Sequence, residues 1–218
     1  MELTEFEDRF IKQLNTLIPF IQLGNREVFG LLRKNPDIYF GESDYTLCDQ
    51  SAFHQIVIES SIMLAYSYFE AFLKDLAQYI TMKNPGIMND AGLQMNCSEI
   101  LGVYSKHGQN GFPHLLTGLV NKYIDKRADR CSNALDFCVD KLNIQDAHNI
   151  RIIKAMIDLR HAIVHNPSEK QEKQREVLRV LKNGNDRILT ETHLNSCGAA
   201  VRQLVSQFIN QAQHLNHA

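Results

Sequence analysis

Apolar side chains recur at spacings of three and four residues along most of the chain, which is the period of an amphipathic helix. Near the N-terminus this pattern predicts one long helix that Pro19 kinks and that ends before Pro36. Residues 37–50 show no period and are expected to form a loop. The apolar stripe of this helix comprises Phe6, Phe10, Leu14, Leu17 and Ile21, and it resumes at Val28 and Leu32.

A second long helix is predicted from about residue 51 to residue 82. Its apolar residues extend around much of the circumference, which indicates a central helix that packs on several sides. No apolar run approaches 18 residues, and Glu59 and Glu70 interrupt the richest stretch, so we expect no membrane span. The core stripe is expected to comprise Ile56, Met63, Tyr66, Phe69, Leu73, Leu76 and Ile80.

The rest of the chain is expected to form shorter helices, because Asn84-Pro85-Gly86 ends the central helix. Asp146 is a plausible N-cap and Asn166-Pro167 a plausible stop for a helix over residues 147–165. Only residues 187–190 suggest a short strand. The pattern therefore predicts an all-α, up-and-down helical bundle with extra short helices in the middle, built as one domain over residues 1–218 with the long N-terminal helix packed on it. The further helices are expected at residues 98–106, 113–124, 130–142, 168–184 and 192–214.

Composition adds limits on the chemistry. The chain has 218 residues and an ordinary hydrophobic content of 44%, so it can bury a sizeable core. Its five cysteines form no CxxC pair and its nine histidines no HExxH motif, so we expect reduced structural cysteines, no metal site and no cofactor. The N-terminus is acidic and amphipathic, unlike a secretory signal, so we expect a cytoplasmic protein.

Charge is unevenly distributed, although the formal net charge is only −2. Residues 1–50 hold nine acidic and five basic side chains, whereas residues 120–187 hold ten acidic and fourteen basic ones. The small net charge argues against a protein that coats nucleic acid without specificity. The basic half leaves local phosphate binding open, beside the simpler interpretation of solvated helix faces.

The segment RHAIVHNP, residues 160–167, carries the most informative chemistry. If Ile157 lies at the centre of a buried stripe with Ile153 and Val164, steps of about 100° per residue place Arg160 and His165 on either side of that stripe.

His161 lies one turn before His165, so the two imidazoles are expected to share a face, and Asp158 is placed to orient His161. Histidine exchanges protons near neutral pH, and arginine holds two phosphate oxygens in a charge-assisted fork. RNA carries its own nucleophile, the 2′-hydroxyl, so these groups suffice for phosphate chemistry without a metal. The alternative is that Arg160 pairs with Asp158 or Glu70 and that His165 only caps the helix end.

The segment RHAIVHN resembles the R-x4-H signature of the HEPN superfamily, with Arg160 and His165 at the signature positions. The upstream segment SSIMLAYSYFEAFLKDL, residues 60–76, is similar to the N-terminal core helix of HEPN proteins, especially of the RiboL-PSP-HEPN-like group. The two segments occur in the expected order, and a terminal helix follows the motif. The resemblance covers about residues 50–215, and it implies a HEPN-like core in this region.

The resemblance implies a concrete activity. HEPN proteins are helical bundles that usually dimerise and bring two R-x4-H motifs into one cleft, and many are metal-independent endoribonucleases. By this resemblance Arg160 binds the scissile phosphate, and His165 acts as general acid or base to leave a 2′,3′-cyclic phosphate. His161 is then a supporting polar residue, and Asn166 helps to fix the helix end. The implied partners are RNA, a second copy bound through the motif helix, and an antitoxin or another defence protein.

Glu70 and Lys74 form a weaker candidate pair on the upstream helix. Some HEPN nucleases carry an ExxxKR motif there that points at the cleft, and Glu70 and Lys74 match its first two positions. Asp75 stands where the arginine belongs, and a spacing of four residues also forms ordinary surface ion pairs, so both interpretations stay open. The loops 84–96 and 107–112 are candidates for mobile segments.

Three functions remain open from the sequence. The first is a HEPN-type endoribonuclease in toxin–antitoxin or antiviral defence. The second is a non-catalytic HEPN module that binds RNA or a nucleotide, or acts as a scaffold in a defence complex. The third is a helical interaction protein with no nucleic-acid partner, in which Arg160 is buried in an ion pair.

Overall fold

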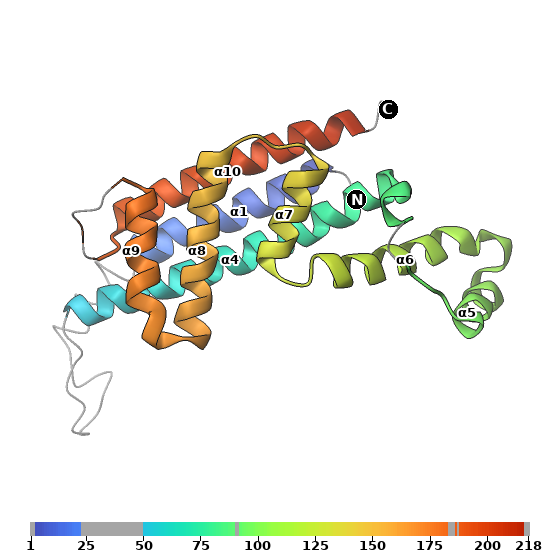
Figure 1. Cartoon of the computed structure of the whole chain (residues 1–218), viewed down its shortest axis with the longest axis horizontal. Coiled ribbons are helices and arrows are strands. Elements are labelled where there is room, and N and C mark those ends of the chain that lie inside the picture. The colour runs from blue at the N-terminus through green and yellow to red at the C-terminus, as the bar shows by residue number, and fades with distance from the viewer. Residues whose placement is uncertain (1–2, 23–49, 90–91, 183–185, 187, 216–218) are drawn as a thin grey trace, which may run out of the picture. The chain divides into compact units, whose positions relative to one another are not determined.

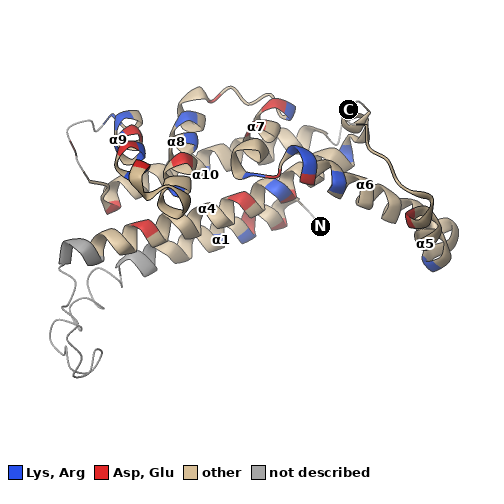
Figure 2. Ribbon diagram, turned by 60° about the horizontal axis from the view of Figure 1, so that its bottom comes forward, with Lys and Arg blue, Asp and Glu red and all other residues tan. Residues whose placement is uncertain are grey.

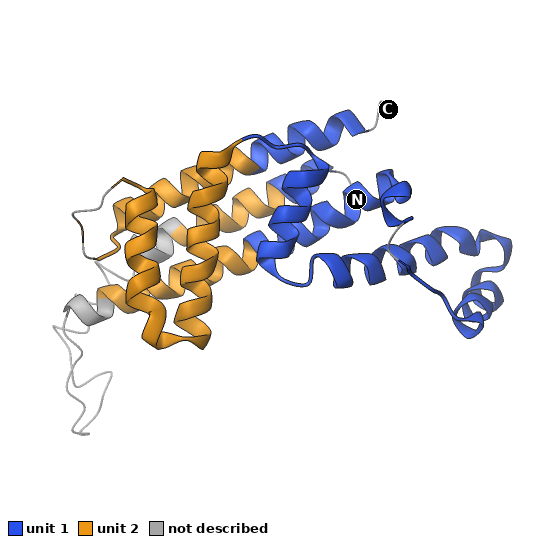
Figure 3. Cartoon of the chain, in the orientation of Figure 1, with its two compact units in different colours: residues 1–7, 69–145, 205–218 blue, residues 8–68, 146–204 orange. Residues whose placement is uncertain are grey.

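The computed structural model describes residues 3–22, 50–89, 92–182, 186 and 188–215, and these residues are almost entirely helical (Figure 1). No strand occurs in these ranges, which confirms the predicted all-α class. The chain divides into two compact units, which Figure 3 colours separately. Unit 1 comprises residues 1–7, 69–145 and 205–218, and unit 2 comprises residues 8–68 and 146–204.

Unit 2 contains the R-x4-H segment. It is built from most of α1 (Leu3–Gln22), the first part of α4 (Gln50–Lys83) and the first part of α10 (Glu191–His214). With these pack α8 (Ala147–His165) and α9 (Lys170–Val180), which lie side by side and are joined by one short turn, η4 (Pro167–Glu169) (Figure 1).

Unit 1 holds the middle of the chain, where the short predicted helices are confirmed. After α4, η2 (Pro85–Met88) leads to α5 (Cys97–His107), η3 (Gly108–Gly111), α6 (Phe112–Arg127) and α7 (Cys131–Lys141). The segment predicted as a loop over residues 107–112 is therefore largely a turn of 3-10 helix between α5 and α6.

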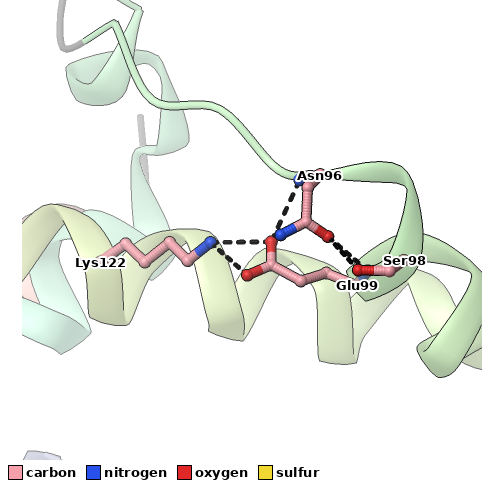
Figure 4. Close-up of polar contacts among 4 residues, drawn as sticks. All are labelled: Asn96, Ser98, Glu99 and Lys122. Atoms are coloured by element: carbon pink, nitrogen blue, oxygen red, sulfur yellow. Dashed lines mark hydrogen bonds and ion pairs between the residues drawn. The ribbon is translucent and has the colours of Figure 1, made fainter.

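The start of α5 is fixed by a capping box (Figure 4). The Asn96 side chain accepts the Glu99 backbone N–H at 2.8 Å, and the Glu99 carboxylate accepts the Asn96 N–H at 3.2 Å. Lys122 Nζ of α6 lies 2.8 Å from both oxygens of the same carboxylate. These bonds satisfy two N–H groups at the helix start and tie α5 to α6.

The apolar stripes predict the buried faces of the two long helices in most positions. On α1 the stripe from Phe6 to Leu17 is buried as predicted, and the helix continues through Pro19. On α4 the stripe is buried from Tyr66 to Ile80, but Ile56 is 55% exposed, so its place in the core was wrong. The predicted continuation through Val28 and Leu32, the end before Pro36 and the loop at residues 37–49 lie outside the described residues, as does the side chain of Ile21.

The later helix bounds agree with the prediction except at α9. The helix predicted to end at Gly184 ends at Val180, because Leu181 leaves the helix and Lys182 adopts a left-handed backbone with a φ of 61°. Gly184 itself lies outside the described residues. The strand suggested at residues 187–190 is absent from its described part, residues 188–190.

The helix α4 is the one described helix that is long and apolar enough, between His54 and Lys83, to cross a membrane. The length and composition of this helix therefore do not support the expectation, made from the sequence, that the chain contains no membrane-spanning helix. Core helices of soluble proteins pass the same test, and α4 buries Ile58, Leu73 and Leu76 completely within the protein. Its packing is that of the central helix that the sequence predicted.

The buried helix faces include a tyrosine hydroxyl and two cysteine thiols. The Tyr66 hydroxyl donates to the Ile153 carbonyl at 3.2 Å, so Tyr66 packs in the core of unit 2 as expected. Burial raises the pKa of the Cys197 thiol to about 12 and also raises that of the Cys138 thiol. No disulfide links the described cysteines; Cys138 and Cys197 are buried as expected of structural thiols, whereas Cys97 is exposed.

We expect Leu159→Ala on α8 to lower the free energy of unfolding by about 2–5 kcal/mol, because Leu159 is 1% exposed and its loss leaves a cavity. His148→Ala, at an exposed position on the same helix, is the matched control and should change it by less than about 1 kcal/mol. Urea unfolding followed by circular dichroism measures both. Equal losses for the two variants would contradict the burial pattern of α8.

Candidate active site on helix α8

The helix α8 has well-defined ends. The Asp146 side chain accepts the backbone N–H of Asn149 at 3.1 Å, which confirms Asp146 as the N-cap. At the other end the Asn166 N–H donates to the Ala162 carbonyl at 3.1 Å, and Pro167 follows and cannot continue the helix. Asn166 therefore fixes the helix end through its backbone, and its exposed side chain makes no cap to the turn η4.

The buried face of α8 differs from the predicted stripe. Ile153 is buried as predicted, but Ile157 is half-buried and Val164 is 44% exposed. The centre of the buried face therefore lies roughly 130° around the helix from Ile157. The buried apolar residues of this face are Ile152, Ile153, Ala155, Met156, Leu159 and Ala162.

Arg160 lies at the edge of the buried face, as the sequence predicted for its guanidinium. It is half-buried and makes no hydrogen bond or ion pair within the described part of unit 2. Asp158, one of the two partners considered for it, lies 4.0 Å from Lys173 of α9 instead. A half-buried guanidinium of this kind is well suited to bind an anion, because binding would satisfy donors that no described residue satisfies.

His161 and His165 share the outer side of α8, with their ring centroids 4.9 Å apart. Both side chains are exposed, so the prediction that His165 flanks a buried stripe was wrong. The cause is the same shift of the buried face, which turns the last turn of α8 outward. Asp158 makes no hydrogen bond to His161 among the described residues, so it does not orient the ring.

These positions give α8 an outward face of mixed character. By helical geometry Arg160, Val164, Ile157, His161 and His165 follow one another around the helix within an arc of about 140°. The helices α8 and α9 also carry both basic and acidic residues (Figure 2). One cation, two imidazoles and two apolar side chains thus form what we call the motif face of α8, an arrangement that can bind a phosphate and move protons.

Glu70 and Lys74 belong to unit 1, whereas the motif face belongs to unit 2. Lys74 Nζ lies 2.9 Å from the Glu70 carboxylate, and the two side chains are 43% and 28% exposed. This contact is the ordinary i, i+4 surface ion pair, which was one of the two interpretations of the sequence. Glu70 therefore has Lys74 as its partner.

Two polar contacts of unit 2 were not found from the sequence. Lys170 Nζ pairs with Glu59 at 2.8 Å across 111 positions of the chain, and no local pattern indicates such a contact. His193 is buried, with Nε2 3.0 Å from Asp186, while Nδ1 accepts the Thr190 backbone N–H at 3.1 Å. Both bonds hold the imidazole at the start of α10, where it satisfies an open N–H group.

A second histidine pair lies in unit 1. The rings of His107 and His114 stack with centroids 3.8 Å apart, and burial together with the neighbouring His114 lowers the pKa of His107. Among the described residues no group of three or more His, Cys, Asp or Glu side chains is placed to hold a metal ion. The pair therefore remains a contact between α5 and α6.

Comparison with known proteins identifies a family for this chain. Residues 42–214 match the family model described as RiboL-PSP-HEPN. The searches of curated proteins and of solved structures found no match. The matched range contains α4, α8 and α10, and therefore the whole motif face.

We expect Arg160→Ala to lower the free energy of unfolding by less than about 1 kcal/mol, because Arg160 has no partner in the described part of unit 2. The matched control is Lys170→Ala, which leaves the 19% exposed Glu59 without its cation and should cost more. Urea unfolding of both variants tests this. A loss of about 3 kcal/mol or more for Arg160→Ala would reveal a buried ion pair and the merely structural alternative.

Proposed function

The chain belongs to the RiboL-PSP-HEPN family, and on this premise we propose that it is a metal-independent endoribonuclease of HEPN type. The observation that carries the proposal is the motif face of α8, where Arg160, which pairs with no described residue, lies with two exposed, neighbouring imidazoles. Family membership supports a nuclease or a related module, and the chemistry of these residues favours the nuclease.

The reaction uses groups that the protein and the RNA both supply. A histidine removes the proton from the 2′-hydroxyl, whose oxygen attacks the adjacent phosphorus as the bond to the 5′-oxygen breaks. The leaving 5′-oxygen takes up a proton, so the products are a 2′,3′-cyclic phosphate and a 5′-hydroxyl, and no water is consumed. Arg160 holds the non-bridging oxygens and stabilises the charge that develops on them.

His165 is the proposed acid or base, and His161 supports it from 4.9 Å away. An imidazole is suited to either role because its ordinary pKa lies near neutral pH. The base and the acid act on opposite sides of the phosphorus, so one reaction needs two such groups. A second copy of the motif face supplies the second group.

Dimerisation through the motif face is supported by its apolar residues. Val164 is 44% exposed and Ile157 half-buried, and by helical geometry both lie between Arg160 and the two histidines. A symmetric contact of this face with itself buries the apolar residues and places two sets of Arg160 and His165 around one cleft. The proposed partners are thus RNA and a second copy of the chain.

The biological setting follows as part of the same proposal. An RNA-cleaving protein of this family fits a toxin–antitoxin system or antiviral defence in the cytoplasm, with an antitoxin or another defence protein as a further partner. The non-catalytic module remains the second candidate, and one observation favours it. No described side chain orients His165 by a hydrogen bond, and a general base is normally held in place by such a third group.

We expect the wild-type protein to cleave RNA in EDTA and to leave 2′,3′-cyclic phosphate ends. Arg160→Ala and His165→Ala should each lower the rate about 10²-fold or more, and His161→Ala should lower it less. His148→Ala, an exposed histidine near the other end of α8, is the matched control and should cleave like the wild type. Gel analysis of end-labelled RNA with end-group mapping measures each rate.

No cleavage by a correctly folded dimer, or cleavage that survives both substitutions, would contradict the nuclease proposal. Tight RNA binding without cleavage, lost in Arg160→Ala, would establish the binding module in its place.

We expect the wild type to be a dimer and Val164→Glu to be a folded monomer, because a charge at the centre of the motif face cannot be buried without cost. Leu101→Glu is the matched control, since Leu101 is 65% exposed on α5 in the other unit. Sedimentation equilibrium distinguishes the species. A monomeric wild type, or loss of the dimer in Leu101→Glu alone, would overturn this interface.

A further inference from the structure

Unit 2 contains a pocket that the proposed reaction does not use. It has a volume of about 660 Å³ and lies between α9, the start of α4 and Ile188, which precedes α10. This volume is within the range of sites that bind small molecules, roughly 300–1,000 Å³. Its described lining comprises Gln55, Lys170, Gln171, Gln174, Arg175 and Ile188.

The pocket is separate from the motif face. Residues 170, 171, 174 and 175 lie within about 140° of one another around α9, which makes them one side of that helix. Lys173, which pairs with Asp158 of α8, lies on a different side of α9. A ligand in the pocket therefore contacts residues of α9 and α4 without using Arg160 or His165.

Among the described lining residues, Arg175 is the cation without a partner. Lys170 is already paired with Glu59 at 2.8 Å. Arg175, in contrast, is exposed and makes no hydrogen bond or ion pair with the described residues. Its acidic neighbours do not neutralise it, because Glu176 pairs with Arg179 and Glu172 forms no described ion pair. A planar guanidinium in this state matches one phosphate group.

The remaining lining suits a nucleobase. Each glutamine amide carries donors and an acceptor in one plane, which is the arrangement that pairs with the edge of a base. One amide, that of Gln55, already donates to Glu59 at 2.8 Å, and Gln171 is exposed at the pocket. Ile188, 53% exposed, offers an apolar surface for the face of the ring.

We propose that this pocket binds a nucleoside phosphate, with the phosphate on Arg175 and the base against the Gln171 amide and Ile188. The ligand is either a free mononucleotide or one residue of an RNA strand, which share this chemistry. The proposal does not depend on whether the motif face cleaves RNA, because the two sites use different residues.

Binding by the full-length protein tests the proposal with four probes. These are AMP, adenosine, ribose 5-phosphate and a 2′-O-methyl RNA hexamer, which cannot be cleaved because its 2′-oxygen is blocked. Isothermal titration calorimetry and the side-chain amide resonances of Gln171 in NMR spectra report binding. The variants are Arg175→Ala and Gln171→Ala, both exposed positions, with Arg179→Ala as the matched control on the same helix but outside the lining.

We expect AMP or the hexamer to bind more tightly than adenosine or ribose 5-phosphate and to shift the Gln171 amide resonances. Arg175→Ala should weaken this binding about tenfold or more, and Arg179→Ala should leave it unchanged. Binding of AMP identifies a free nucleotide as ligand. Binding of the hexamer without AMP identifies an RNA residue, provided that it shifts the Gln171 resonances and is weakened in Arg175→Ala, because the motif face also binds RNA in the proposed function. Three results would overturn the proposal. The first is that neither AMP nor the hexamer binds, and the second is that Arg175→Ala and Arg179→Ala bind the ligand equally well. The third is that ribose 5-phosphate binds as tightly as AMP.

Discussion

The position of α8 depends on the burial of one of its sides. Ile152, Met156 and Leu159 pack into unit 2, and the Tyr66 hydroxyl bonds the Ile153 carbonyl, so the rotation of the helix about its axis is fixed. Because successive residues of a helix are about 100° apart, this fixed rotation also determines where every other side chain of α8 points. Arg160 is left at the edge of the core, and His161 and His165 are directed outward. The chemistry of the motif face is thus a consequence of packing on the opposite side.

The same constraint explains which features the sequence predicts well. A helix with one clear apolar stripe, such as α1, has one way to bury it, so the buried positions from Phe6 to Leu17 follow from spacing. On α8 apolar residues occur on both sides, and spacing alone cannot select which side faces the core. The prediction centred on Ile157 therefore placed His165 beside the core, whereas the packing of Met156 and Leu159 exposes it.

Contacts between distant segments were beyond the sequence pattern for a different reason. The pair Lys170–Glu59 and the pocket around Arg175 depend on which helices become neighbours in unit 2. Periodicity within a helix contains no information on that choice. The signature residues Arg160 and His165 were found because their spacing lies within one helix, and family resemblance added the order of the helices around them.

In the proposed mechanism the motif face is both the dimer interface and the reaction site. The dependence of RNA cleavage on protein concentration tests this most directly. If two motif faces form one site, the rate per protein chain should rise with concentration below the dissociation constant of the dimer and then reach a plateau. The plateau should begin where sedimentation shows the dimer to be complete. A rate per chain that stays constant across the whole monomer–dimer transition would contradict the account, because one motif face would then suffice.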